Sequence, residues 1–175
     1  PRRSPAFREG PVSFLGDAGV MEGASSKLSQ ETEERLGAMA GSETDPGVRR
    51  QLACSAKRFS GPLALALLQE LILRHDDSKD PQIPLLLWWA LEARAVSERE
   101  QVLRMFDEKS FWDAPVVGKF MVERLARRYA AEGTDIGFES CSRLPARAPG
   151  AAAKNLCFVG MEKAWEGRGP QRVSA

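Results

Sequence analysis

The sequence contains few of the residues that build disulfide frameworks and metal sites. Its three cysteines are odd in number, far apart and never arranged as C-x-x-C: Cys54, Cys141 and Cys157. Such spacing encodes neither a set of disulfides nor a zinc or haem attachment site. We therefore interpret the three thiols as buried side chains and predict no metal ligands.

Recognisable catalytic groups are equally scarce. The only histidine, His75, is followed by Asp76 and Asp77, a combination that could serve a metal ion or a general base. Adjacent residues in a turn point in different directions, so we interpret this stretch as a polar connection with a helix cap. Phosphate-cradling glycine loops, nucleophile elbows and H-E-x-x-H are missing as well. We predict no catalytic residue, no cofactor and no independent enzyme activity.

A strong charge of either sign is missing too. The 25 basic and 24 acidic residues leave a formal net charge of +1, which is too small to draw the chain to nucleic acid or anionic lipid. The longest apolar run, residues 83–91, contains Pro84 and is far too short to span a bilayer. We expect neither a nucleic-acid partner nor direct membrane insertion. A start at Pro1 without a leader pattern indicates a fragment or a processed product.

What the sequence does contain favours helices. Leu and Ala together number 41, whereas the β-branched Val, Ile and Thr number only 16. Unbranched side chains and Ala lose the least conformational freedom on entering a helix. With 43% hydrophobic residues the chain can also bury a core. We predict an all-α protein.

Three prolines mark a repeat. Pro46, Pro81 and Pro115 are 35 and 34 residues apart, and each can begin a helix, since the first helical position needs no N–H. The residues two positions later are all apolar: Val48, Ile83 and Val117. Three prolines could match by chance, but the hydrophobic register argues against it. A period of this size with two helices in each unit is typical of stacked helical repeats, because a lone pair cannot bury its apolar face.

Among helical repeats, the pattern resembles HEAT repeats best. The Trp, Gly, Tyr and Pro positions of tetratricopeptide repeats do not recur, whereas residues 45–49 fit the Asp-x-x-Val-Arg start that is common in HEAT-like repeats. Pro84 and Gly118 occupy the Arg position in the later units, so we expect any charge ladder between repeats to be broken. The predicted fold class is an all-α, HEAT/armadillo-like α-solenoid of about three to four antiparallel helix pairs.

The predicted organisation has four parts. An irregular N-terminal segment, 1–28, is punctuated by Pro and Gly. The HEAT-like repeats occupy 29–133, with helices at 29–41, 45–58, 62–74, 80–95, 97–106 and 113–133. A C-terminal helical segment with a partial repeat follows at 134–168, and 169–175 form a disordered tail.

Four residues are candidates for contact with a partner. Trp88 and Trp89 are adjacent, and adjacent helix residues lie about 100° apart, so only Trp88 fits the inner apolar stripe. Trp89 then either packs against the neighbouring repeat or stands in a groove as an aromatic anchor. Arg124, Arg127 and Arg128 either complement the negative end of their helix or contact an anion or acidic peptide.

Four stretches of the sequence resemble a known family: DPGVRRQLACSAKRF at 45–59, DPQIPLLLWWALEA at 80–93, RLARRYAAEG at 124–133 and GMEKAWEGR at 160–168. They resemble the HEAT-like repeat region of large bacterial proteins described as membrane-bound dehydrogenases or haem-binding CxxCH proteins. The likeness runs from roughly Val12 to Arg168, and IPLLLWWALEA is its most specific part.

The resemblance implies a parent protein with a sugar-dehydrogenase-type β-propeller, this helical array and a cytochrome c-like module, located in the periplasm or exported. No C-x-x-C-H motif is present in the sequence, so no haem ligand carries over. We predict a non-catalytic helical-repeat scaffold or protein-interaction module, a fragment of a larger protein, which contacts a protein partner or neighbouring domains. The alternative is a structural spacer in a redox protein. A third hypothesis, a DNA-binding helical-repeat enzyme, would need a basic groove.

Overall fold

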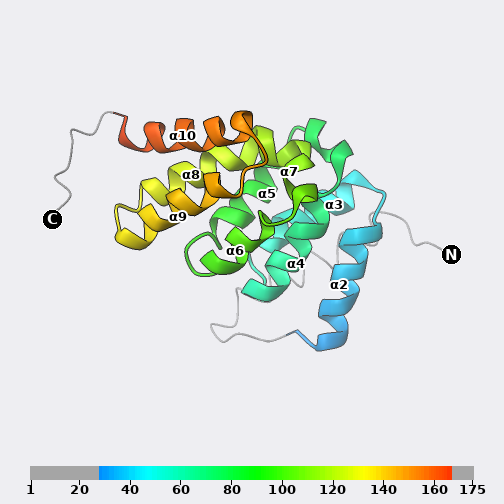
Figure 1. The fold of residues 1–175 in the computed structure, drawn as a ribbon. Coiled ribbons are helices and arrows are strands. Elements are labelled where there is room, and N and C mark those ends of the chain that lie inside the picture. The colour runs from blue at the N-terminus through cyan, green and yellow to red at the C-terminus, as the bar shows by residue number, and fades with distance from the viewer. Residues whose placement is uncertain (1–27, 167–175) are drawn as a thin grey trace. The chain divides into compact units, whose positions relative to one another are not determined.

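The computed structural model describes residues 28–166, and every regular element in that range is helical (Figure 1). The prediction of an all-α protein is therefore confirmed. The predicted tail and all but the last residue of the predicted irregular segment 1–28 lie outside the described residues. Within 28–166, none of the helices is both long and apolar enough to cross a membrane.

The helices follow one another with short connections. In chain order they are α2 (Gln30–Ser42), α3 (Pro46–Ala56), α4 (Gly61–Ile72), the 3-10 helix η1 (His75–Lys79), α5 (Ile83–Glu92), α6 (Arg99–Met105), α7 (Lys109–Asp113), the π-helix η2 (Val117–Met121), α8 (Val122–Ala130), α9 (Asp135–Ala146) and α10 (Ala151–Trp165).

The chain divides into two compact units, with the boundary inside α6 between Val102 and Leu103. We call these the first unit and the second unit, and each is described by itself. The predicted limits of the repeat region, at 29 and 133, stay a prediction.

Side-chain caps start helices α2 and α9. The Ser29 hydroxyl accepts from the Thr32 N–H at the start of α2, and the Thr134 hydroxyl accepts from the Gly137 N–H at the start of α9. These bonds satisfy N–H groups that have no partner within their own helix. The predicted start at Ser97 lies two residues early, because α6 begins at Arg99.

In the first unit, helices that are two apart in the chain pack together. The contacts join α2 to α4 and α3 to α5, and α4 also packs against both α3 and α5. Val48 on α3 and Ile83 on α5, which the repeat register equates, are both fully buried. Their equivalent in the second unit, Val117, is fully buried as well. All three positions are therefore buried, although Val117 begins the π-helix η2 rather than an α-helix. That they are equivalent positions of a repeat stays a prediction.

A buried ion pair holds α3 to the connection between α4 and α5. Arg49 Nε and Nη2 donate to the two carboxylate oxygens of Asp77 at 2.7 and 2.5 Å, and Asp77 is only 2% exposed. Arg49 Nη1 also donates to the Glu43 carbonyl oxygen at 3.3 Å, at the end of α2. The hydrogen bonds that Arg49 donates to Asp77 raise the pKa of Arg49, so the guanidinium stays charged despite its burial. One side chain thus connects α2, α3 and η1.

A second polar contact ties the turn after α5 to the α3–α4 connection. Arg94 donates to the carbonyl oxygens of Lys57 and Phe59. The Glu98 carboxylate lies so close to Gly61 that a Cβ there would sit 2.2 Å from Glu98 Oε1. Gly61 is the first residue of α4, where the helix dipole favours a negative charge.

In the second unit, α8 is the central helix. Both α9 and α10 pack against it (Figure 1), and α10 approaches most closely at Gly160. A Cβ on Gly160 would lie 2.1 Å from the Glu123 carbonyl oxygen, so only glycine permits this crossing. Lys163 Nζ then pairs with a Glu123 carboxylate oxygen at 2.7 Å.

Replacing Asp77 by Asn should lower the free energy of unfolding by about 3–5 kcal/mol, because it leaves the Arg49 guanidinium buried without its counter-charge. The measurement is urea-induced unfolding followed by circular dichroism. Asp76→Asn is the matched control, because Asp76 is exposed and should change stability by no more than about 0.5 kcal/mol. Equal effects of the two substitutions would contradict the role given to the pair.

Replacing Gly160 by Ala should destabilise the second unit, because the added methyl group overlaps the Glu123 carbonyl and forces α10 away from α8. We expect a loss of about 1–3 kcal/mol, the usual range for overpacking, measured by thermal unfolding. Gly118→Ala is the control, since a Cβ at Gly118 meets nothing within 4 Å. A Gly160→Ala protein as stable as the control would refute the close crossing.

Candidate binding groove

The first two proline-containing starts share the same aspartate hydrogen bonds. Asp45 Oδ1 accepts from the N–H groups two and three residues later, at 2.8 and 3.1 Å. Asp80 Oδ1 does the same at 2.8 and 2.9 Å. Both carboxylates therefore cap the free N–H groups of the chain that enters the next helix, α3 or α5. The two helices do not begin at equivalent residues, because α3 begins at Pro46, directly after Asp45, whereas α5 begins at Ile83, three residues after Asp80. The prediction that Pro81 begins a helix is therefore wrong by two residues.

The third proline start differs from the first two. Ala114 precedes Pro115 where Asp precedes the other two prolines, so no carboxylate occupies the capping position. Asp113 is one residue too early, and its carboxylate pairs with Lys109 at 2.5 Å. The chain continues as the π-helix η2 before α8 begins at Val122.

An ion pair links the starts of α3 and α5. Arg50 Nη2 donates to Asp80 Oδ2 at 3.1 Å. Burial alone would raise the pKa of the Asp80 carboxyl, but hydrogen bonds from Ile83, Gln82 and Arg50 lower it below its ordinary value. One ion pair thus joins the starts of two predicted units through Arg50, the residue after the expected Arg position. That a ladder of such contacts along the repeats is broken stays a prediction.

A groove of about 570 Å³ lies between α3 and α5. Apart from Pro81, its lining consists of four pairs of residues that the 35-residue register equates: Gly47 with Gln82, Arg50 with Leu85, Gln51 with Leu86, and Cys54 with Trp89. On each helix these positions follow the i, i+3, i+4, i+7 spacing of one helical face. The same face of two equivalent helices therefore forms the groove.

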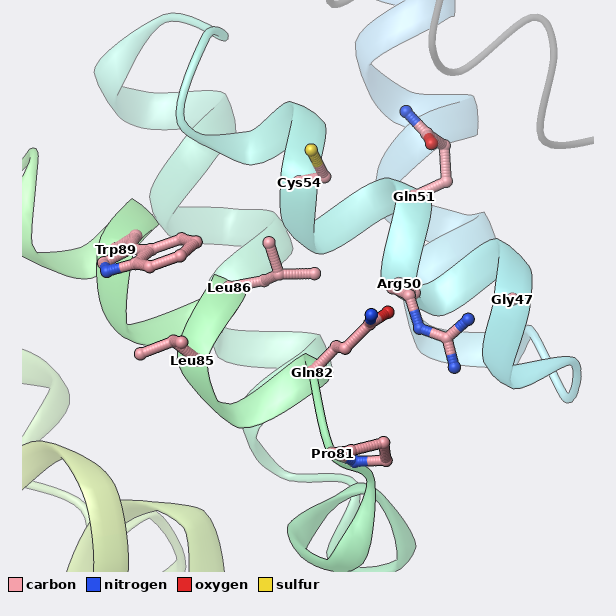
Figure 2. Close-up of a pocket in the computed structure, with 9 residues that line it drawn as sticks. All are labelled: Gly47, Arg50, Gln51, Cys54, Pro81, Gln82, Leu85, Leu86 and Trp89. Carbon is pink, nitrogen blue, oxygen red and sulfur yellow. The ribbon is translucent and has the colours of Figure 1, made fainter.

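The two walls of the groove differ in chemistry (Figure 2). The α3 wall is polar, and Arg50 is the only charged residue in the lining. The α5 wall presents Leu85, Leu86 and Trp89, of which Leu85 is 37% and Trp89 46% exposed. Exposed aromatic and aliphatic side chains beside a fixed cation are typical of a surface that binds another chain.

Of the predicted contact residues, one lies in the groove and three do not. Trp89 lines the groove and is 46% exposed, and its role as an aromatic anchor stays a prediction. Arg124 donates to the Phe120 carbonyl oxygen at 2.9 Å, and its guanidinium lies 5.7 Å from the centre of the Phe120 ring. Arg127 and Arg128 lie in the last turn of α8, where the helix dipole favours positive charge.

Sequence reasoning missed most of the groove. The 35-residue register pairs the lining positions, but these are polar on α3 and apolar on α5, so they do not form a hydrophobic pattern that repeats. Among residues 28–166, no group of three or more His, Cys, Asp and Glu side chains could hold a metal ion. The groove offers hydrogen bonds, one positive charge and apolar surface, which is the chemistry of binding.

The three thiols should differ in reactivity in the native protein. Cys54 is half-buried in the groove, 3.8 Å from Arg58 Nη2, whereas Cys141 and Cys157 are buried. Burial raises the pKa of Cys157 to about 11, which leaves about one thiol in a thousand ionised at pH 8. We expect iodoacetamide to modify Cys54 at least about tenfold faster than the other two thiols, as read by peptide mass spectrometry.

Concentrated guanidinium chloride provides the control for this experiment, because all three thiols should then react at similar rates. Cys54→Ser should remove the fast reaction from the native protein. Fast labelling of Cys141 or Cys157 before unfolding would contradict the burial described above.

No family model matches the chain, and comparisons with curated proteins and with solved structures also find no match. The resemblance to the HEAT-like region of bacterial dehydrogenase-type proteins therefore stays a prediction. What the chain does is inferred from the groove.

Proposed function

We propose that this chain is a non-catalytic helical-repeat module that binds a segment of a partner protein, or of a neighbouring domain, in the groove between α3 and α5. The observation that carries this proposal is the lining of the groove by matched positions of two equivalent helices. The finer fold that we propose is an α-solenoid, in which helix pairs stack and leave such grooves along one face.

Contacts within the first unit support stacking. In a solenoid each helix packs against its equivalent in the next repeat, and here α3 packs against α5 while α2 packs against α4. The Arg50–Asp80 pair joins the fifth residue of α3 to the cap of α5, so the two helices begin side by side. Equivalent helices in this arrangement present equivalent faces to a ligand.

The exposure of the α5 wall supports binding. A large aromatic side chain at 46% exposure keeps apolar area in water, and burying it against a partner removes that area at about 25 cal/mol per Å². Trp is also among the residues that most often dominate interface energies. The surrounding polar groups, from Gln51, Gln82 and Arg50, can then fix the orientation of the bound segment.

A photo-crosslinking amino acid at position 85, in the protein as its cells produce it, should attach to one discrete partner. The same substitution at Gln69, an exposed residue of α4 outside the groove lining, is the control and should not capture that partner. Capture from both positions alike would indicate non-specific contact and would sink the proposal.

The captured partner then allows a quantitative test with purified proteins. Trp89→Ala should weaken its binding about 30-fold or more, the loss typical of an interface hot spot, as measured by calorimetry. Trp165→Ala is the matched control, because Trp165 is 48% exposed but belongs to α10 in the second unit. Unchanged affinity of the Trp89→Ala protein would refute the proposed binding site.

A further inference from the structure

The charge distribution in the groove specifies the kind of segment that fits. Arg50 is the only charged residue of the lining, and the apolar surface lies on the opposite helix. A bound segment must therefore place an apolar side chain on the α5 wall and meet a positive charge on the α3 wall. A carboxylate is the protein group that complements a guanidinium in charge and in geometry.

Arg50 is incompletely neutralised by its partner in the protein. Its Nη2 donates to Asp80, but its Nε is buried without an acceptor among residues 28–166. The side chain remains 39% exposed. Asp80 in turn shares its charge with two backbone N–H groups that it caps. The guanidinium therefore retains donors and charge for a second acceptor.

Buried donors without acceptors carry a free-energy cost. A small rotation of the guanidinium toward a ligand carboxylate would give Nε or Nη1 an acceptor while Nη2 keeps its bond to Asp80. Arg50 and Trp89 line the same groove. One bound segment can therefore contact Trp89 with one residue and Arg50 with a residue near it.

We propose that the groove between α3 and α5 selects a segment of a partner protein that carries an apolar side chain and, within a few residues, a Glu or Asp. The apolar side chain packs on Leu85, Leu86 and Trp89, and the carboxylate accepts hydrogen bonds from Arg50. This inference rests on the proposed function and adds the chemical class of the ligand.

The probe is a pair of nonapeptide pools, acetylated and amidated at their ends so that only side chains differ. One pool has a central Leu with Glu at one of the neighbouring positions in a Gly/Ser background, and the other has Gln in place of Glu. Binding is read as protection of Cys54 from iodoacetamide, because Cys54 lines the same groove. We expect the Glu pool to protect Cys54 at concentrations about tenfold lower than the Gln pool.

The wild-type protein supplies a test that needs no substitution. A contact to a partly exposed guanidinium is screened by salt, so about 1 M NaCl should reduce the preference for Glu over Gln to about threefold or less. A preference that is insensitive to salt would overturn the assignment to Arg50.

Arg50 variants separate this inference from the proposed function. Arg50→Gln should abolish the Glu preference but keep weak protection by both pools, whereas Arg50→Lys, which retains the charge, should keep part of the preference. Loss of protection by both pools in Trp89→Ala confirms the groove as the site in each case. Equal protection by the Glu and Gln pools in the wild type overturns the inference and leaves the proposed function standing. Protection by inorganic phosphate as strong as by the Glu pool also overturns it, because the site would then bind anions rather than a protein segment.

Discussion

The buried pair of Arg49 and Asp77 is the contact on which the first unit depends. Two charges removed from water are tolerated only when each meets the other with good geometry, because desolvation offsets much of their attraction. The pair therefore acts chiefly by fixing how α3 is aligned with η1, because any other alignment leaves one of the two charges buried alone. Asp80 follows Asp77 by three residues and caps the chain that enters α5, so the pair also positions the start of α5 beside α3.

The groove is a consequence of this alignment and of side-chain size. When α3 and α5 begin side by side, a space remains between their solvent-facing sides. On α3 this space is lined by Gly47, Gln51 and Cys54, which are too small or too polar to fill it. The α5 wall carries larger apolar groups, of which Leu85 and Trp89 remain exposed. A close-packed interior would leave no such space. The groove therefore belongs to the surface of the first unit and not to its core.

Local signals predicted the helices well, and the non-local contacts poorly. The Asp-Pro pair and the apolar residue two positions after the proline placed α3 and α5 to within three residues and predicted the burial of Val48 and Ile83. Pro46 occupies the first position of α3 as predicted, whereas Pro81 lies two residues before α5. Asp77 was interpreted as part of a polar connection, because nothing near it in the sequence shows that its partner lies 28 residues away on another helix. The ion pair of Arg50 with Asp80 was not predicted, because the HEAT-like motif Asp-x-x-Val-Arg ends at Arg49 and Arg50 is the residue after it. The groove was not predicted either, because it is lined by positions of the same register other than the buried ones that revealed the repeat.

The same register shows why the groove involves only the first two proline starts. With the 34-residue step from Pro81 to Pro115, the positions equivalent to Leu85, Leu86 and Trp89 become Lys119, Phe120 and Glu123. Within the second unit, Glu123 is paired with Lys163 of α10, and the Phe120 ring lies beneath the Arg124 guanidinium. Lys119 and Glu123 thus place charged side chains at two of the three positions, whereas Phe120 keeps an aromatic side chain at the third. The apolar face that α5 contributes to the groove is therefore not repeated at these positions of the second unit, where Glu123 instead holds α8 to α10.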